Sequence, residues 1–467
     1  MKPLLFVVSS ATSYRLQRVF AEYCVASGRK ILFLYDQSPD SLFAEIESDA
    51  FRLGAKALSL DSLIRDGDRP GLCWARMPHP LRARFFSLLA SPKRSATVRA
   101  LGARIAAAQK VLEAESPAVV LVSEDGISGP AAIIAAARSL ELPVVDLPYG
   151  YGTQQDLDIA LEEKEANNEL IRAEGWAGHL VAMFAPAWVK RGRYSGALIF
   201  PPTYIAAREA LGMTLRNAWI VHGGYADSLL AESDQMMGRY RSEGLPEEKL
   251  VLTGSPYCDT LFSALNDDPL ATAAFRRARP IEPGRLRILV SWPPSYHASR
   301  SAKCEFPSYE EMSRQVLGWL DALPNCRLTV SLHPAMQGEV REGIERMGLN
   351  ISRDYVIGLI PKHDIYISYY SSTIRWAIAS GKPVVNYDAY GLGLDVYEAA
   401  PGFFNAPTFD AFKHEVTRLT SSASEFEHSA AQQSSVAEHW GLVDGQCMQR
   451  ILVELDRLST ARQAHAV

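Results

Sequence analysis

Short apolar runs alternate with longer amphipathic stretches along most of the chain. Apolar runs that predict strands lie at 4–8, 31–35, 118–122, 143–147, 179–184, 219–222, 250–253, 286–291, 327–332, 364–368 and 383–387. Amphipathic stretches that predict helices lie at 14–27, 309–322, 338–347, 372–380 and 408–421. Apolar strands that alternate with helices are typical of a parallel sheet covered on both faces. We therefore predict an α/β fold with two doubly wound, Rossmann-like domains that face each other across a cleft.

The length of the chain and one polar stretch predict where these domains lie. With 467 residues the chain is too long for one compact core and suits two domains. Residues 266–285 are polar and carry proline and glycine, as a linker does. We predict an N-terminal domain at 1–265, this linker, a C-terminal domain at 286–430, and a helical stretch at 431–467 that packs back on the first domain.

The composition excludes several classes of protein. Hydrophobic residues make up 48% and charged residues 22%, which is ordinary for a globular protein. The formal net charge of −5 excludes a general nucleic-acid binder, and no apolar run approaches the roughly 20 residues of a membrane-spanning helix. The six cysteines are scattered, so we expect no metal site, no disulfide framework and a cytoplasmic location.

Residues 76–110 contain no acidic residue. The segment carries eight basic residues: Arg76, Arg82, Arg84, Lys93, Arg94, Arg99, Arg104 and Lys110. One interpretation is a solvated helix face that is balanced by acids elsewhere. The other is a patch that binds an anionic lipid or glycan, which predicts a peripheral membrane contact.

Two adjacent carboxylates follow the predicted strand at 118–122. Glu124 and Asp125 precede Gly126 at the point where the strand turns toward the next helix. Ligands of doubly wound sheets bind outside the carboxyl ends of the strands. Two like charges this close raise the pKa of at least one carboxyl, which suits a general base toward a hydroxyl. The alternative is that Asp125 or Ser128 only caps the helix.

Two further motifs follow predicted strands of the second half. His333 and Pro334 end the strand at 327–332, where an imidazole can hold a phosphate oxygen; the alternative is a structural histidine. A hydroxyl-rich turn of Ser371, Ser372 and Thr373 follows the strand at 364–368 and opens a helix. The free N–H groups of a helix N-terminus and these hydroxyls suit a phosphate, whereas simple capping needs only one hydroxyl.

A Gly-Ser-Pro turn at Gly254 and Ser255 follows the strand at 250–253. It either approaches a bound donor or is a plain hinge turn. The first strand is not followed by GxGxxG, and the chain has no GxxxxGK[ST], so neither a dinucleotide fingerprint nor a P-loop is present.

These motifs, in this order, resemble the GT-B superfamily of nucleotide-sugar glycosyltransferases and the related UDP-N-acetylglucosamine 2-epimerase fold. The resemblance covers about residues 115–155 and 220–400. It is most similar to bacterial sialyltransferases and capsule-type transferases that use CMP-activated acidic sugars, which carry a D/E-D/E-G motif, an HP motif and a serine pair. The matching residues here are Glu124-Asp125-Gly126, His333-Pro334 and Ser371-Ser372.

The resemblance implies a metal-independent glycosyltransferase that needs no cofactor besides its nucleotide-sugar substrate. Glu124 or Asp125 is then the base, and His333 with the serine pair binds the phosphate of CMP. The expected donor is a CMP-linked sialic-acid-like or Kdo-like acid, and the expected acceptor is a surface glycan or its lipid-linked precursor. The first domain then serves the acceptor and the second the donor, and inversion is the simplest outcome.

Three alternatives remain open at this point. The donor can be a UDP-sugar. The chain can be a UDP-N-acetylglucosamine 2-epimerase, although the HxEAG and GHRRE segments of those enzymes are replaced here by residues 146–150 and 291–294. It can also be a non-catalytic protein that binds glycans or nucleotides.

Overall fold

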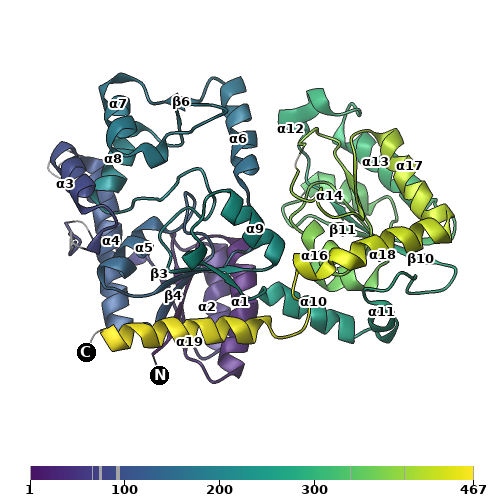
Figure 1. Cartoon of the computed structure of the whole chain (residues 1–467), viewed down its shortest axis with the longest axis horizontal. Helices are drawn as coiled ribbons and strands as arrows, with labels where there is room; N and C mark the ends of the chain where they lie inside the picture. Colours follow the sequence, from purple (N-terminus) through teal and green to yellow (C-terminus); the bar gives the residue numbers. More distant parts are fainter. Residues whose placement is uncertain are drawn as a thin grey trace. The chain divides into compact units, whose positions relative to one another are not determined.

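The chain forms two compact units, each built around a parallel sheet (Figure 1). The computed structural model describes residues 2–465 apart from 66, 73–75, 91–94, 337 and 394. The first unit holds Met1–Ala231, Met237–Thr253 and Met448–Val467, and the second holds Glu232–Met236 and Gly254–Cys447. The boundary after Thr253 lies ahead of the predicted linker at 266–285, and residues 254–285 belong to the second unit. No helix in the described ranges is both long and apolar enough to cross a bilayer.

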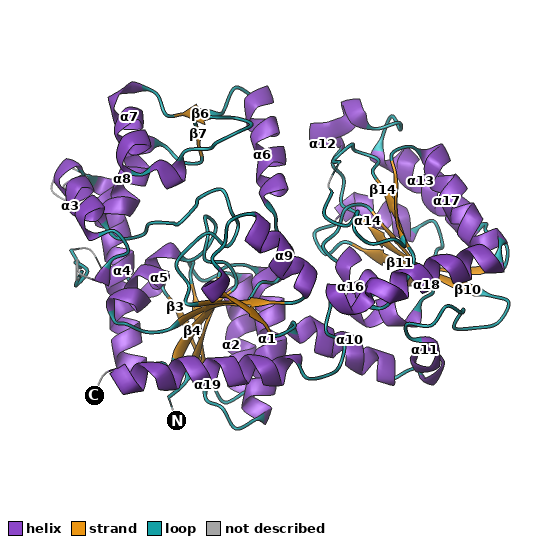
Figure 2. Ribbon diagram, in the orientation of Figure 1, coloured by secondary structure: helices purple, strands orange, loops and turns teal. Residues whose placement is uncertain are grey.

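The first unit has a seven-stranded sheet with the order β3-β2-β1-β4-β5-β8-β9. Its strands are β1 (Leu4–Val8), β2 (Ile31–Tyr35), β3 (Lys56–Ser59), β4 (Val119–Val122), β5 (Val144–Asp146), β8 (Ser228–Ala231) and β9 (Leu250–Leu252). All of these pairings are parallel, and Leu4 lies between Ile31 and Val119. β1, β2 and β4 are buried along their whole length because helices cover both faces of the sheet (Figure 2).

The helices around this sheet come from both ends of the chain. They are α1 (Ala11–Ala26), α2 (Ser41–Arg52), α4 (Ala96–Glu115), α5 (Ala131–Ser139), α9 (Asp234–Ser242) and α19 (Cys447–His465). In α19, Glu454 accepts a hydrogen bond from Ser228 (2.7 Å), and Gln449 accepts one from Tyr23 (3.0 Å). The last helix therefore belongs to the first unit from Met448 onward, whereas residues 431–447 of the predicted C-terminal stretch belong to the second unit.

A subdomain is inserted between β5 and β8. It contains α6 (Gln154–Ala166), the antiparallel pair β6 (Ile171–Arg172) and β7 (Ala197–Leu198), α7 (Gly175–Phe184) and α8 (Pro202–Ala210). The helix α3 (Pro80–Leu89) packs against α8. The core of this subdomain includes Phe86, Trp188 and Trp219.

Two strand predictions in this region are wrong. Residues 179–184 belong to α7, because Gly178 and Val181, three residues apart, are buried on one side of a helix. Residues 219–222 form a turn, because the side chain of Asn217 accepts a hydrogen bond from the Trp219 N–H (2.9 Å) and offers the backbone a local partner.

The second unit has a six-stranded parallel sheet with the order β12-β11-β10-β13-β14-β15. Its strands are β10 (Leu286–Trp292), β11 (Cys326–Leu332), β12 (Ile351–Ser352), β13 (Ile365–Ser368), β14 (Val384–Tyr387) and β15 (Phe403–Ala406). Its helices are α10 (Pro256–Asn266), α11 (Pro269–Ala274), α12 (His297–Arg300), α13 (Tyr309–Asp321), α14 (Gly338–Glu345), α15 (Val356–Leu359), α16 (Ile374–Ala379), α17 (Phe409–Ser421) and α18 (Ala423–Trp440). The predicted strands of this half are present with shifts of one residue at their ends.

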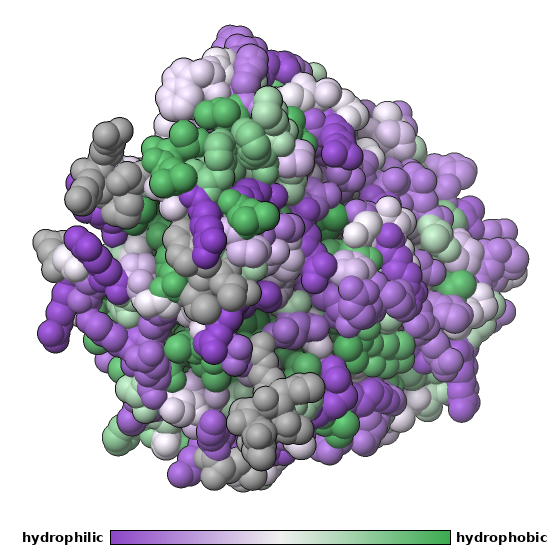
Figure 3. All heavy atoms as spheres, turned by 60° about the vertical axis from the view of Figure 1, so that its left-hand side comes forward, coloured by the Kyte–Doolittle hydropathy of each residue, from purple (hydrophilic) through white to green (hydrophobic). Residues whose placement is uncertain are grey.

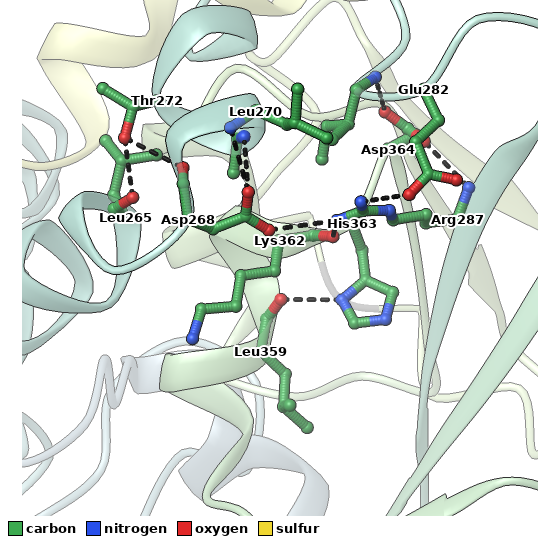
Figure 4. Close-up of polar contacts among 12 residues, drawn as sticks. Leu265, Asp268, Leu270, Thr272, Glu282, Arg287, Leu359, Lys362, His363 and Asp364 are labelled. Carbon is green, nitrogen blue, oxygen red and sulfur yellow. Dashed lines mark hydrogen bonds and ion pairs between the residues drawn. The ribbon is translucent and has the colours of Figure 1, made fainter.

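Asp364 accepts backbone hydrogen bonds from the segment that leads into the second sheet (Figure 4). Its two oxygens accept hydrogen bonds from the backbone N–H groups of Ile281 and Arg287, each at 2.8 Å. The Arg287 guanidinium in turn pairs with Asp268 (3.1 Å) and with Glu282. One buried carboxylate therefore ties residues 268–287 to the start of β13.

We expect Asp364→Ala to lower the free energy of unfolding by about 3 kcal/mol, because two buried N–H groups lose their acceptor. The shift of the urea midpoint measures this loss. The control is Glu427→Ala on the exposed face of α18, which should change the midpoint little. Equal midpoints for the two variants would contradict this role for Asp364.

Candidate active site

Most predicted site residues follow strands that lie beside the point where the strand order of a sheet reverses; Gly254 and Ser255 instead follow β9, at the edge of the first sheet. In the first sheet the order reverses between β1 and β4, and Glu124 and Asp125 follow β4. In the second sheet it reverses between β10 and β13. His333 follows β11, next to β10, and Ser371 follows β13. Ligands of doubly wound sheets bind at such switch points.

Asp125 is buried, and its two oxygens accept three hydrogen bonds. Its Oδ2 accepts hydrogen bonds from Lys249 Nζ and from the Ala226 N–H, both at 2.7 Å, and its Oδ1 accepts one from the Gly224 N–H at 3.1 Å. Burial acts to raise the pKa of Asp125, but the Lys249 ammonium and these hydrogen bonds outweigh it and hold the pKa below its usual value. Asp125 is thus an ionised structural anchor, which favours Glu124 over Asp125 as the base.

The partner of Asp125 in this ion pair, Lys249, lies 124 residues later in the chain. It lies just before β9, and its Nζ also donates to the backbone oxygen of His222 (2.6 Å). Both charged side chains are almost fully buried. A buried charge needs a close partner to offset its desolvation, so each of the two depends on the other.

A second pair, Asp146 and His222, lies beside the anchor. Asp146 ends β5, and its Oδ2 accepts hydrogen bonds from His222 Nδ1 (2.7 Å) and from the Asp125 N–H (3.1 Å). Burial acts to lower the pKa of His222, but the carboxylates of Asp146, Asp125 and Glu124 raise it above its usual value. These carboxylates therefore favour the protonated form of His222 next to Glu124.

These groups have the ligand types of a metal site. Asp125, Asp146 and His222 place one ligand atom each within 4.8 Å of one another. The Lys249 ammonium already contacts Asp125, so the cation that this cluster needs is supplied by the chain. The cluster thus fits a built-in ammonium ion better than a divalent metal.

Glu124 differs from its neighbour because it is only half-buried. Its Oε1 accepts a hydrogen bond from the Ser128 N–H at 2.9 Å. Burial raises the pKa of Glu124 to about 7, against the opposing effects of His222 and this hydrogen bond. The predicted direction of the shift is correct, but its cause is desolvation, and the charge of Asp125 contributes least. A carboxyl with a pKa near neutrality suits proton transfer at physiological pH.

Gly126 lets two backbone segments meet at this site. A side chain at Gly126 would collide with the carbonyl oxygen of Val221. At Gly129 a side chain would likewise collide with the carbonyl of Glu124. We therefore assign Gly126 to the packing of the loop, and its predicted contact with substrate stays a prediction.

The second unit presents His333 at the end of β11. Its backbone N–H donates to the Trp292 carbonyl (3.1 Å), which continues the β10–β11 register. Its Nδ1 accepts a hydrogen bond from the Ala335 N–H (3.1 Å), so a neutral ring carries its proton on Nε2. The side chain and Pro334 are both exposed. The geometry thus gives His333 an oriented N–H donor at the protein surface.

The hydroxyls of the predicted phosphate turn are partly used within the protein. Thr373 is buried and its hydroxyl contacts those of Tyr366 (2.5 Å) and Ser371 (2.8 Å). Ser372 is exposed and Ser371 half-buried. The helix α16 begins at Ile374, two residues after the predicted start. Ser371 and Ser372 therefore remain the better candidates for a ligand than Thr373.

A buried arginine stabilises the backbone of this turn. Arg375 donates to the Ser372 carbonyl, and its Nε donates to Glu232 Oε2 at 3.0 Å. The Trp376 indole donates to the other oxygen of Glu232 at 2.7 Å. Tyr397 also donates to the Ser371 carbonyl (3.2 Å). These contacts fix the backbone of the turn, which keeps its two serines in place.

Gly254 and Ser255 have structural roles that explain why a glycine and a serine occupy these two positions. Gly254 has φ +79°, and a side chain there would collide with the sulfur of Cys447. Ser255 is buried and caps α10 by accepting the Tyr257 N–H (3.3 Å). These contacts favour the alternative of a hinge turn for this pair.

Most described basic side chains of segment 76–110 are neutralised locally. The pairs are Arg76 with Glu141 (3.1 Å), Arg82 with Glu209 (2.7 Å), Arg104 with Asp36 (2.8 Å) and Lys110 with Asp68 (2.7 Å). Lys93 and Arg94 lie outside the described residues. For the paired residues, the structure favours the interpretation that acids elsewhere balance the charge.

The sequence interpretation missed Asp146, His222 and Lys249. Asp146 ends a predicted strand, so its place at the site could have been inferred from the same rule that singled out Glu124. His222 lies in a turn where the apolar run predicts a strand, and no local signal marks Lys249. Asp146 and His222 are 76 residues apart in the sequence, and Asp125 and Lys249 are 124 apart, so periodicity does not reveal these contacts.

We expect Lys249→Met to destabilise the protein by about 3–5 kcal/mol, because it leaves the Asp125 carboxylate buried without a counter-charge. Urea unfolding followed by circular dichroism measures the loss. The double variant Asp125→Asn with Lys249→Met should recover part of it, since no uncompensated charge remains. A double variant no more stable than Lys249→Met would contradict the ion-pair explanation.

Comparison with known proteins shows the fold. No protein-family model matches the sequence, and no curated protein matches it either. The chain is similar to the crystal structure of UDP-GlcNAc 2-epimerase from Neisseria meningitidis bound to UDP-GlcNAc, with 14% identity over 97% of this chain and 99% of that chain and a TM-score of 0.50. Another UDP-N-acetylglucosamine 2-epimerase structure matches with 13% identity over 97% and 96% and a TM-score of 0.51.

Glycosyltransferase structures also match. CalG4, the calicheamicin glycosyltransferase, has 13% identity over 98% of both chains and a TM-score of 0.49, a level that supports no conclusion by itself. Together with the two parallel sheets, the likeness to the epimerase structures confirms the predicted fold class. The chain has an α/β fold with two Rossmann-like domains, the fold that it shares with these UDP-GlcNAc 2-epimerase structures.

Proposed function

We propose that this chain is a glycosyltransferase that moves a sugar from a nucleotide sugar to a hydroxyl of a glycan or lipid-linked acceptor. The observation that carries this proposal is Glu124, a half-buried carboxyl whose pKa is raised to about 7 at the carboxyl end of β4. Its neighbour Asp125 is paired with Lys249, which leaves Glu124 as the better base of the two adjacent carboxyls.

In the proposed reaction, the acceptor oxygen attacks the anomeric carbon and its proton passes to Glu124. The bond from that carbon to the phosphate oxygen breaks, and negative charge develops on the leaving nucleotide. The Nε2–H of His333 and the hydroxyls of Ser371 and Ser372 are donors that suit this charge. One base and no covalent intermediate correspond to inversion at the anomeric carbon.

We propose a CMP-linked acidic sugar as the donor. Support comes from the order of the three motifs, Glu124-Asp125-Gly126, His333-Pro334 and Ser371-Ser372, each placed after a strand. A UDP-sugar is the alternative donor, and UDP-GlcNAc is the molecule bound in one structure of the same fold.

An epimerase acting on a UDP-sugar is the second candidate function, and the fold likeness to such enzymes favours it. It predicts an epimerised sugar and free UDP without any acceptor. Proton NMR of the products from UDP-N-acetylglucosamine distinguishes the two candidates, because a transferase acting on water releases the unepimerised sugar.

We expect the kcat/KM for nucleotide release from CMP-sialic acid or UDP-N-acetylglucosamine to rise with pH through about 7 and then level off, because Glu124 acts only when deprotonated. Glu124→Gln should lower the rate by about 10²–10⁴-fold and remove this limb of the profile. Glu113→Gln, on the exposed face of α4, is the matched control and should keep both the rate and the pH profile of the unchanged chain. Full turnover in Glu124→Gln would exclude Glu124 as the base.

We expect His333→Ala to slow nucleotide release by about 10²–10³-fold, because one donor to the leaving phosphate is lost. The double variant Ser371→Ala with Ser372→Ala should have an effect in the same direction. His428→Ala, an exposed histidine of α18 in the same unit, is the control. If His333→Ala and His428→Ala turn over equally well, the assignment of the phosphate to His333 is wrong.

A further inference from the structure

The first unit exposes large apolar side chains on α3 and α7. We call this patch the α3–α7 surface and define it by Leu81, Leu88, Leu89, Trp176, Met183 and Phe184. Leu88 is 82%, Trp176 75% and Met183 70% exposed. Figure 3 shows apolar side chains gathered on the face of the molecule that this view brings forward. Single exposed apolar residues are normal, whereas a contiguous group marks an interaction site.

The two helices form one continuous surface. The rings of Phe85 on α3 and Phe184 on α7 lie 4.2 Å apart between centroids. A groove of about 390 Å³ runs along them, and its apolar lining includes Phe86, Leu89, Trp176 and Leu180. Of the exposed residues that define the surface, Leu89 and Trp176 therefore line a shared apolar depression.

The sequence of α7 explains why it is apolar on its outer side as well. Its ten residues, GWAGHLVAMF, include no Asp, Glu, Lys or Arg. Gly178 and Val181 are buried against the subdomain, and Trp176, Met183 and Phe184 are left outside. A helix that is apolar on its buried side and its exposed side needs a second apolar surface to cover it.

Positive charge accompanies the patch. Arg84 is exposed on α3 and lies three residues from Leu81 and four from Leu88, so the three share one face of the helix. The segment from 76 to 110 contains no acid, and the acid nearest in sequence to α7 is Glu174, at its N-cap. Leucine, tryptophan and phenylalanine beside arginine suit the boundary between acyl chains and anionic headgroups.

We propose that the α3–α7 surface docks the protein on a lipid bilayer that contains anionic lipid, with Leu88, Trp176 and Met183 inserted and Arg84 among the headgroups. This inference does not depend on the proposed reaction, because the patch contains none of the residues assigned to it. A bilayer covers a broad apolar rim with a cationic neighbour without requiring a matching partner shape.

Flotation of the full chain with vesicles tests this surface. We expect binding to vesicles of phosphatidylcholine mixed with phosphatidylglycerol, and weaker binding to phosphatidylcholine alone. Leu88→Ser with Met183→Ser should reduce the bound fraction by about tenfold, because insertion scales with buried apolar area. Arg84→Glu should reduce binding only to the anionic vesicles. All three positions are exposed, so these changes leave the fold intact.

Phe51→Ser is the matched control, because Phe51 is 89% exposed on α2, outside the patch, and its loss should not change binding. Absence of vesicle binding by the unchanged chain would overturn the proposal, as would an equal loss in Phe51→Ser. Size-exclusion chromatography with light scattering gives the third outcome: a dimer that Leu88→Ser with Met183→Ser dissociates would assign the surface to a second copy of this chain instead.

Discussion

The ion pair between Asp125 and Lys249 holds the candidate base in its environment. Through Asp125 it joins the loop after β4 to the backbone of Gly224 and Ala226, and through Lys249 it joins both to the start of β9. The charge of Asp125 raises the pKa of Glu124 less than burial does. The half-buried position of Glu124 then sets its proton affinity. A structural carboxylate and a titratable one thus stand side by side in sequence with different roles.

The same division between anchoring and exposed groups recurs in the second unit. Arg375 and Glu232 are buried and fix the turn after β13, while Ser371 and Ser372 stay accessible. His333 is oriented by a hydrogen bond to its Nδ1 and is exposed. In both units, hydrogen bonds within the protein orient polar groups that a ligand can reach, which lowers the free-energy cost of organising them during binding.

Much of the fold could be predicted because parallel strands are continuously apolar. The strands β1, β2 and β4 are buried and lie within a residue of the predicted runs. The rule fails where an apolar run lies outside a sheet: residues 179–184 are helical and partly exposed, and Trp219 lies in a turn set by Asn217. Apolar composition alone does not distinguish these cases.

The positions of the candidate site residues could be predicted because these residues follow the carboxyl ends of strands. Glu124, Asp125, His333 and Ser371 all lie where that rule places them. What Asp125 does, however, depends on Lys249, 124 residues later in the chain. The support of Ser371 and Ser372 likewise depends on Glu232, 143 residues before Arg375. Such long-range pairs decide which members of a motif stay available for chemistry.

Nucleotide binding tests the central claim, that the chain acts on a nucleotide sugar, most directly. The measurement is the melting temperature of the full chain with CMP, CDP, UDP, GDP or ADP, each with and without EDTA. A ligand that binds only the folded state raises this temperature. The account predicts stabilisation by CMP, unchanged by EDTA; stabilisation by UDP alone would move the donor to a UDP-sugar. A melting temperature that none of the five nucleotides changes would contradict the account.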